Sequence, residues 1–263
     1  MGEAPSELLQ WKTGRQALAN ALDRPALVDQ VLNGQGLPLE GPYLSSSWAY
    51  NPDLLTSYSF DLATANSLLD EAGWPLPEGS TTRKKDDAPL NLNLITLDTP
   101  QHKAMAETIG QQWSHTGIDT EITLANNIND LRQLLDEGAF DVALVDFAPP
   151  GDPDLYDFWS QEAIINGNNV AGWNNRKASE SLEDGRQTWP TTDRRLAYNT
   201  FQRHYNQSLP ALTIYQHVYT YALSPEVNQV EIGLITEPRN RYQTLAQWFL
   251  QYRDIAIDCS ADK

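Results

Sequence analysis

A strand-helix-strand-helix-strand pattern in the middle of the chain constrains the fold most strongly. It predicts, in order, a strand at 90–94, a helix at 101–115, a strand at 118–124, a helix at 129–137 and a strand at 140–145. Alternation at these spacings predicts a parallel or mixed sheet with right-handed crossovers. Ligands of such sheets bind beyond the carboxyl ends of the strands, so function is expected first in the stretch after Val145.

Two short helices are expected before this pattern. Residues 15–22 form the first, and the second continues the same apolar stripe after Asp23. Asp23 is expected to cap the second helix, and Gly34 is expected to end it in the left-handed conformation.

The flanking segments give three further expectations. Asp61 is expected to cap a helix that ends at Gly73, and polar residues at 75–89 predict an exposed connection. A helix is expected at 193–208. Its predicted apolar face consists of Leu196, Ala197, Phe201 and Tyr205. A strand-like, Tyr-rich stretch follows at 209–227.

Composition disfavours several classes of function. Of the 263 residues, 40% are hydrophobic and 20% charged, which is typical of a folded protein with a core. A net charge of −17 disfavours nucleic acid and anionic membranes as partners. No stretch approaches the ~20 apolar residues that span a bilayer, so we expect no direct membrane insertion. We also expect no signal peptide in this chain, and Cys259 is the one cysteine.

The sequence contains no recognisable catalytic or metal-binding motif. The four histidines lack the short spacing of a zinc site, and there is no nucleophile elbow, phosphate loop or dinucleotide fingerprint. Asp152 and Asp154 resemble a catalytic carboxylate pair, but aspartates in a proline-containing loop more often cap turns. A hydrolase is therefore the weakest hypothesis, and we expect no catalytic residue, no metal and no cofactor.

Aromatic residues are numerous, with 8 Trp and 11 Tyr. The helical spacing of Trp113 indicates a core residue. Small-ligand sites combine apolar walls with a few polar groups, so aromatic residues near the expected ligand loop are candidates to line a pocket. These are Trp159, Trp173, Tyr215, Tyr219 and Tyr221.

Six stretches occur in an order that is characteristic of one family. They are "RQALANALDRPALVDQVLNGQGLPLEGP", "WAYNPDL", "DLATANSLLDEAGW", "FDVALVDFAPPGDPDLYDFWS", "NNVAGWNN" and "DRRLAYNTFQRHYNQSLPALTIYQ". The series resembles the bacterial extracellular solute-binding proteins, family 5, of the peptide/nickel class. The resemblance covers residues ~11 to ~250, and the ordered series is more specific than any single motif.

The resemblance implies an α/β fold, namely a periplasmic-binding-protein-like lobe with a mixed, largely parallel sheet flanked by helices. It also implies three segments. Residues 1–10 would be the end of a missing first lobe or a leader, 11–222 the second lobe, and 223–263 a segment returning to the first lobe plus a polar tail. The helix pair at 15–32 would then be scaffold.

In this family the implied function is binding without catalysis. The chain would belong to a substrate-binding component of an ABC importer that captures a small peptide or similar solute between two closing lobes. Its implied partners are the solute, the transporter permease and the missing N-terminal lobe of the same protein. The implied location is periplasmic or extracellular, lipid-anchored or soluble. An alternative function is a ligand-sensing domain of a transcription regulator.

Two positions depart from the family pattern. Pro149 stands where peptide binders carry an aspartate for the ligand's amino terminus, and only Asp146 or Asp152 could substitute. Ser179 stands where the family has another aspartate, which weakens one expected helix cap.

The predicted ligand contacts lie in the loop after the third strand, in the Tyr-rich strand and in the entry loop. They are Phe147, Asp152, Trp159, Asn169, Trp173, Tyr215, Trp48 and Tyr50. Half of the contacts would come from the missing lobe, so the sequence does not identify the solute. We expect the chain alone to bind it weakly, because an open half-site leaves the ligand solvated.

Overall fold

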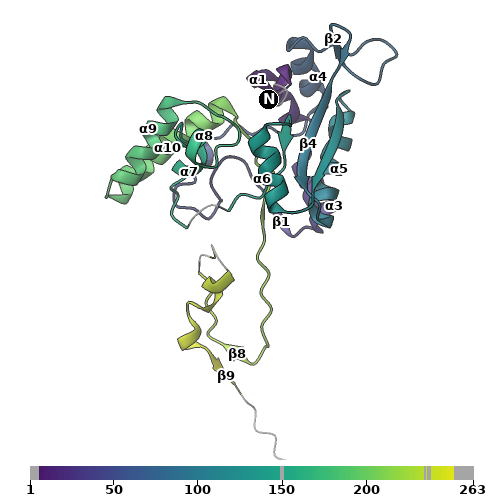
Figure 1. The fold of residues 1–263 in the computed structure, drawn as a ribbon. Helices are drawn as coiled ribbons and strands as arrows, with labels where there is room; N and C mark the ends of the chain where they lie inside the picture. Colours follow the sequence, from purple (N-terminus) through teal and green to yellow (C-terminus); the bar gives the residue numbers. More distant parts are fainter. Residues whose placement is uncertain (1–5, 149–150, 234, 236–237, 252–263) are drawn as a thin grey trace, which may run out of the picture. The chain divides into compact units, whose positions relative to one another are not determined.

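The structure is a computed structural model that describes residues 6–148, 151–233, 235 and 238–251. It divides into two compact units, Met1–His217 and Val218–Lys263 (Figure 1). Pro149 and Cys259 lie outside the described residues. Within the described part, no helix has the length and the apolar character needed to cross a membrane.

Three helices open the larger unit: α1 (Glu7–Gln10), α2 (Lys12–Asn20) and α3 (Arg24–Leu32). The predicted cap is confirmed, since the Asp23 carboxylate accepts a hydrogen bond from the Ala26 N–H at 3.0 Å. The end of α3 comes one residue earlier than expected. Asn33 is left-handed at φ 49°, and Gly34 follows at φ 74°. Asparagine tolerates this conformation better than most side chains, so the turn does not require glycine first.

The helix α4 (Leu62–Glu71) begins at its predicted cap, where Asp61 accepts hydrogen bonds from the N–H groups of Ala63 and Thr64. Gly73 follows the helix at φ 82°, as expected for a left-handed end. Between α3 and α4, a short 3-10 helix, η1 (Pro52–Leu54), interrupts the loop.

The prediction of an exposed connection at 75–89 is wrong in two respects. The stretch contains a small hairpin of β2 (Lys84–Lys85) and β3 (Ala88–Pro89). It also contains Arg83, whose side chain is only 2% exposed. The guanidinium of Arg83 donates to the carbonyls of Trp74 and Thr116 and pairs with Asp70 at 2.5 Å. A buried arginine needs such partners, and a polar sequence pattern does not reveal them.

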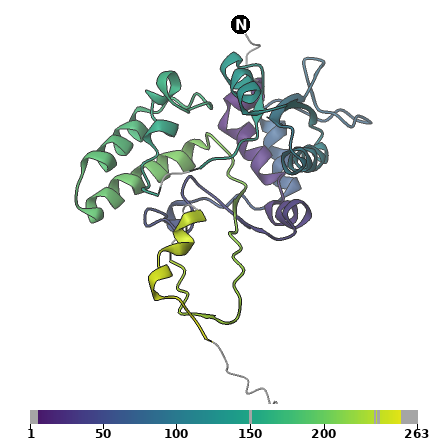
Figure 2. The ribbon, with the colours of Figure 1, turned by 60° about the horizontal axis from the view of Figure 1, so that its bottom comes forward.

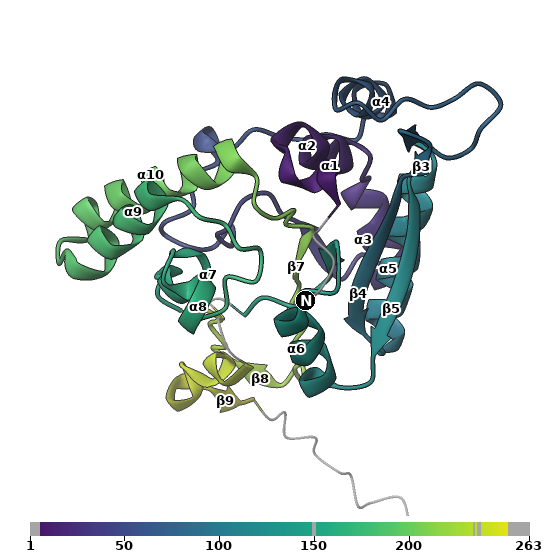
Figure 3. The ribbon, with the colours of Figure 1, turned by 45° about the horizontal axis from the view of Figure 1, so that its top comes forward.

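The central sheet has the strand order β5-β4-β6, and both of its pairings are parallel. Figure 3 shows β4 and β5 side by side. Its strands are β4 (Asn91–Leu97), β5 (Asp119–Ala125) and β6 (Val142–Ala143). The predicted sheet is therefore confirmed. The strand β6 is shorter than the predicted 140–145, although the N–H groups of Asp141 and Leu144 still bond to β4 carbonyls.

Two helices cover opposite faces of this sheet: α5 (Pro100–Ser114) and α6 (Ile128–Glu137). Leu92 and Leu94 belong to the same buried cluster as the apolar residues of α5. Ile95 belongs to a second cluster with Leu131 of α6. Alternate residues of a strand point to opposite faces, which explains the division. Trp113 is 3% exposed, which confirms it as a core residue.

The rest of the larger unit is mostly helical: α7 (Tyr156–Trp159), α8 (Ala163–Asn166), α9 (Arg176–Gln187) and α10 (Thr191–Ser208). Helices α9 and α10 lie side by side as a hairpin (Figure 2). The predicted buried face of α10 is wrong at Leu196, which is 66% exposed. Tyr198 is buried instead, because it shares one helical stripe with Phe201 and Tyr205.

Two strands link distant parts of the larger unit. The strand β1 (Gly36–Pro38) pairs antiparallel with β7 (Tyr215–His217). Within the described residues, β7 is the only part of 209–217 that forms a strand. This pairing brings the start of the predicted Tyr-rich stretch back to the first helices.

The smaller unit contains β8 (Val227–Asn228), β9 (Phe249–Leu250) and two 3-10 helices, η2 (Pro238–Tyr242) and η3 (Leu245–Gln247). None of its described residues is buried. Its exposed large hydrophobic residues are Val218, Tyr219, Leu223, Ile232, Tyr242, Leu245, Phe249 and Leu250. The guanidinium of Arg241 stacks over the rings of Tyr221 and Tyr242.

Candidate functional site

The carboxyl ends of β4 and β6 meet where the winding of the sheet reverses. From β4 the chain runs through α5 to β5 on one side, whereas the connection through α6 leads to β6 on the other side of β4. Ligands of open α/β sheets bind in the crevice that such a reversal leaves. The stretch after Val145 begins at this edge, next to the residues that follow β4.

An imidazole and a carboxylate face each other across the reversal. His102 lies in the first turn of α5, and its Nε2 is 3.2 Å from Oδ2 of Asp146, which follows β6. Thr99, the cap of α5, accepts a hydrogen bond from the His102 N–H, and its Oγ1 is 2.7 Å from His102 Nδ1. In the tautomer with the proton on Nε2, the imidazole can donate to Asp146 while Nδ1 accepts from the Thr99 hydroxyl. The side chain of Asp146 is 65% exposed, so a ligand can reach it.

Tyr215 extends this group of polar side chains from β7. Its hydroxyl accepts a hydrogen bond from Gln101 Nε2 at 3.1 Å, and its ring packs edge-on against His217. Burial raises the pKa of Tyr215 above its usual value, and the negative charge of Asp146 raises it further. We call Thr99, Gln101, His102, Asp146 and Tyr215 the switch-point cluster.

The switch-point cluster is only partly contained in the sequence prediction. Tyr215 was predicted as a ligand contact, whereas Gln101 and His102 were missed. A signal for both existed, because they follow β4 just as Asp146 follows β6. The same rule about strand ends, applied to β4, would have found them.

Four of the predicted contact residues lie together in a second group. Trp48, Tyr50, Trp159 and Trp173 pack against the buried rings of Tyr43, Tyr198, Phe201 and Tyr205, and we call these eight residues the aromatic cluster. Trp159 and Trp173 meet Tyr205 edge-on, with ring centroids 5.0 and 5.9 Å away. Such contacts show that these rings pack the interior, and their predicted role at a ligand remains a prediction.

The predicted contacts Phe147 and Asn169 have different surroundings. Phe147 is 38% exposed, and its ring lies 4.4 Å from that of Phe158. Asn169 is buried, where its amide donates to the carbonyls of Ser160 and Trp173 and accepts from the Trp173 N–H. Asn169 thus fixes the turn around Trp173.

The aspartates considered for hydrolysis are both paired with arginines. Asp152 pairs with Arg194 and Asp154 with Arg186. Both also cap turns, since Asp152 accepts from the Asp154 N–H and Asp154 accepts from the Tyr156 N–H. The interpretation of these residues as turn caps is confirmed. Each carboxylate is therefore engaged by both an arginine side chain and a loop N–H group.

Ser179, the other departure from the family pattern, keeps a polar role. Its hydroxyl accepts a hydrogen bond from the Gln161 N–H at 2.8 Å and donates to the Asn175 carbonyl. Asn175 itself caps α9 by accepting from the Ala178 N–H. The helix therefore retains a side-chain cap.

A crevice lined by Arg24, Tyr58, Tyr205 and Thr213 has space for about one water molecule. No group of three or more histidine, cysteine, aspartate or glutamate side chains in the described part of the chain could hold a metal ion. The switch-point cluster lies at the surface, where Gln101 and Asp146 are exposed.

An α/β lobe with polar side chains at a sheet switch point is typical of proteins that bind ligands at that edge. Residues 6–166 match the sequence model of the bacterial extracellular solute-binding proteins, family 5, middle part. The match includes the whole central sheet and most of the switch-point cluster. This chain therefore belongs to the bacterial extracellular solute-binding proteins, family 5, which confirms the predicted family.

Individual relatives agree with the family assignment. The chain is 28% identical over 187 residues to the oligopeptide-binding protein AppA of Bacillus subtilis, covering 69% of the chain and 34% of AppA. It is 29% identical over 217 residues to the heme-binding protein A of Haemophilus influenzae, covering 81% and 38%. The chain thus spans well under half the length of these relatives.

Solved structures confirm the predicted fold. The structure of AppA from Bacillus subtilis in complex with a nonapeptide superposes with a TM-score of 0.73 at 22% identity, over 94% of this chain and 49% of that one. NikA from Brucella suis in complex with Fe(III)-EDTA gives 0.72 at 21% identity, over 95% and 49%. Identities this low support the fold alone.

Proposed function

We propose that this chain is the C-terminal lobe of the substrate-binding component of an ABC importer. The observation that carries the proposal is the family match over residues 6–166, in a chain whose central sheet brings His102 and Asp146 together at the winding reversal, where Tyr215 of β7 bonds to Gln101. The named relatives are binding proteins, which supports a role in solute capture without catalysis. A periplasmic or extracellular location and a permease partner belong to the same proposal.

A small peptide is the solute that this site favours. The amide of Gln101, the imidazole of His102 and the hydroxyl of Tyr215 are groups that hydrogen-bond to peptide amides and carboxylates. Phe147, which follows Asp146 in the sequence, is 38% exposed and offers an apolar surface. Sites that hold small ligands typically combine an apolar surface with a small number of precisely placed polar groups.

The other half of the site lies, in this proposal, on a further lobe of the protein. The chain covers 34% to 49% of AppA, and its switch-point cluster lies at the surface. The smaller unit exposes many large hydrophobic residues and buries none of its described ones, so we expect another segment to cover it. The assignment of 11–222 to the second lobe and of 223–263 to the returning segment and tail is part of this proposal. A ligand-sensing domain of a transcription regulator remains the alternative, and no contact among the described residues favours it.

Calorimetry on the full-length gene product tests the proposal with four probes: tri-alanine, a mixed-sequence nonapeptide, Ni(II)–L-histidine and hemin. We expect at least one peptide to bind with micromolar or tighter affinity and to raise the Tm. The 263-residue chain alone is the control and is expected to bind the same peptide more weakly, because half of the contacts are missing. Binding of hemin or the nickel complex without either peptide would overturn the peptide assignment. Binding of none of the four would overturn the proposed site.

A further inference from the structure

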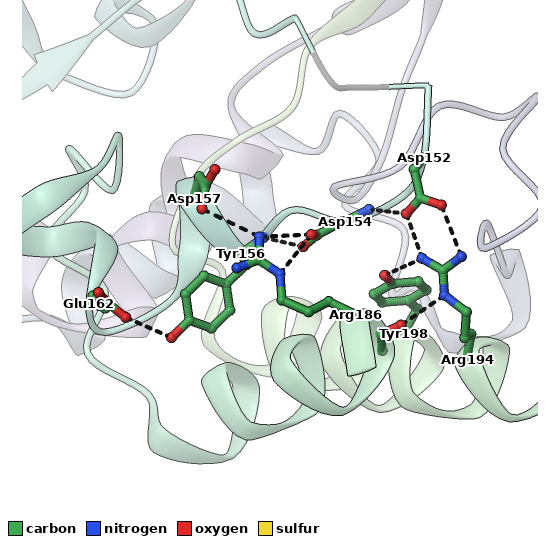
Figure 4. Close-up of polar contacts among 9 residues, drawn as sticks. Asp152, Asp154, Tyr156, Asp157, Glu162, Arg186, Arg194 and Tyr198 are labelled. Carbon is green, nitrogen blue, oxygen red and sulfur yellow. Dashed lines mark hydrogen bonds and ion pairs between the residues drawn. The ribbon is translucent and has the colours of Figure 1, made fainter. Parts of the chain in front are cut away.

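The α9–α10 hairpin holds the loop after β6 through two ion pairs that solute capture does not itself explain (Figure 4). Arg186, in the last turn of α9, contacts Oδ2 of Asp154 at 2.7 Å. Arg194, in the first turn of α10, contacts both carboxylate oxygens of Asp152, at 2.9 and 2.6 Å. The hairpin thus binds the loop through two aspartates that are two residues apart.

Arg194 is fixed on several sides. Its Nε donates to the Gly185 carbonyl at 2.8 Å, and its Nη2 also donates to the Tyr198 hydroxyl at 2.9 Å. The guanidinium lies over the rings of Trp48 and Tyr198. Its pKa is raised, chiefly by the hydrogen bonds to Asp152. Exposed ion pairs are usually weak, but a two-pronged pair with an immobilised arginine is among the strong ones.

The two aspartates pass this restraint on to the loop backbone. Oδ1 of Asp152 accepts from the Asp154 N–H at 3.1 Å, and Oδ1 of Asp154 accepts from the Tyr156 N–H at 3.0 Å. Each carboxylate therefore joins an arginine of the hairpin to a peptide group of the loop. Trp159, a predicted ligand contact, is the last residue of α7 and ends this segment.

We infer that Arg194 and Arg186 are positioning residues for the loop 151–159, and that Asp152 orients this loop instead of binding a positively charged group of the solute. For its effect on solute binding, the inference rests on the proposed function. For its effect on the loop, it does not. Because the Asp152 carboxylate is already paired, the loop does not select for a free amino terminus through this residue.

Amide hydrogen exchange in the full chain tests the positioning role without a ligand. Arg194→Gln is expected to speed exchange at the Asp154 and Tyr156 amides about tenfold and to leave the β4 amides unchanged. Arg195→Gln is the matched control, since Arg195 is exposed and makes no ion pair in the described part of the chain. Unchanged exchange at both loop amides in Arg194→Gln would overturn the inference.

A conservative variant keeps the test decisive if Arg194→Gln does not fold. Arg194→Lys keeps the positive charge and most of the side-chain packing, but a lysine cannot bind both Asp152 oxygens in the planar arrangement. In Arg194→Lys, we expect the Asp154 and Tyr156 amides to exchange faster than in the wild type but more slowly than in a loop that lacks the ion pair. Exchange equal to wild type would show that the paired bond does not position the loop.

Binding of the nonapeptide probe to the full-length protein distinguishes positioning from direct contact. Arg194→Gln is expected to weaken binding about tenfold, and adding Asp152→Asn to it is expected to cause no further loss, because the Asp152–Arg194 pair is already broken. A further loss when Asp152→Asn is added to Arg194→Gln would mean that Asp152 contacts the peptide, which overturns the inference. If the wild type binds no probe, the proposed function fails, while hydrogen exchange still decides the positioning role.

Discussion

The sheet and the aromatic cluster are held together by different kinds of interaction. The sheet is packed by aliphatic side chains, and Leu90, Leu92, Leu94 and Ile95 are all 0% exposed. The aromatic cluster is packed by rings at defined angles, with Arg194 stacked on its rim. Aliphatic burial depends mainly on area, whereas ring and guanidinium contacts depend on direction.

This difference indicates that the sheet serves as a rigid scaffold, whereas the aromatic cluster sets the orientation of a loop. The sheet gives the switch-point cluster a fixed edge, because its contacts are many and tolerate little movement. The aromatic cluster and the Asp152–Arg194 pair set the orientation of a loop by a few directional contacts. Substitutions in the first region should therefore change stability, and substitutions in the second should change how the loop is presented.

The largest effect is expected from Arg83→Met, which removes a buried guanidinium beside the sheet. The substitution leaves the carbonyls of Trp74 and Thr116 without these donors and removes the pair with Asp70. We expect a loss of about 4 kcal/mol in the free energy of unfolding, measured by urea denaturation. Arg176→Met is the control, since its pair with Glu180 is on the surface, and a change within about 0.5 kcal/mol is expected. Similar losses in the two variants would mean that Arg83 is not structural.

Gly185→Ala should break the packing of the aromatic region. A Cβ at this position would lie 2.3 Å from Cε1 of the buried Tyr198 ring, so the ring must shift. We expect a loss of about 2 kcal/mol in the free energy of unfolding, after the usual helical gain of alanine over glycine. Gly110→Ala in α5 is the matched control, because its Cβ would meet Thr120 at 3.3 Å, and we expect little change. Equal tolerance at both positions would contradict the directional packing of the aromatic cluster.

The sequence predicted the sheet region well because local pattern decides it. The hydrophobic periodicity of the strands and the helix within residues 90–125 is visible inside each element. The caps at Asp23 and Asp61 depend only on the first turn of the helix that follows. The buried Arg83 could not be predicted in this way, because its acceptors come from three separate segments.

The candidate site was harder to predict than the fold. Trp48, Trp159 and Trp173 were recognised as unusual, but whether a ring packs a core or faces a ligand depends on tertiary contacts. The partner of Asp152 is 42 residues away in the sequence, and nothing in either local pattern identifies it. His102 was accessible to the rule about strand ends and was missed because that rule was applied only after the last strand.

His102→Ala tests whether the switch-point cluster, at the carboxyl edge of the sheet, contacts the solute. The substitution removes the imidazole that faces Asp146 without touching the aromatic cluster. We expect the full-length protein to bind the peptide probe about tenfold more weakly, equivalent to about 1.4 kcal/mol. His115→Ala, at the exposed C-terminal end of the same helix, should bind normally. If His102→Ala binds the peptide with normal affinity, the ligand contacts would instead be assigned to the aromatic cluster.

The smallest effect concerns His204 on α10. Burial lowers the pKa of His204, and the positive charges of Lys177 and Arg203 lower it further. Below the unfolded-state pKa of about 6.5, the unfolded chain then binds more protons than the folded one, so stability falls as the pH falls toward the folded-state pKa. We expect the Tm to decline gradually below pH 6.5, and His204→Asn to flatten this part of the pH profile. If the Tm of His204→Asn declines below pH 6.5 as steeply as that of the wild type, groups other than His204 cause the decline.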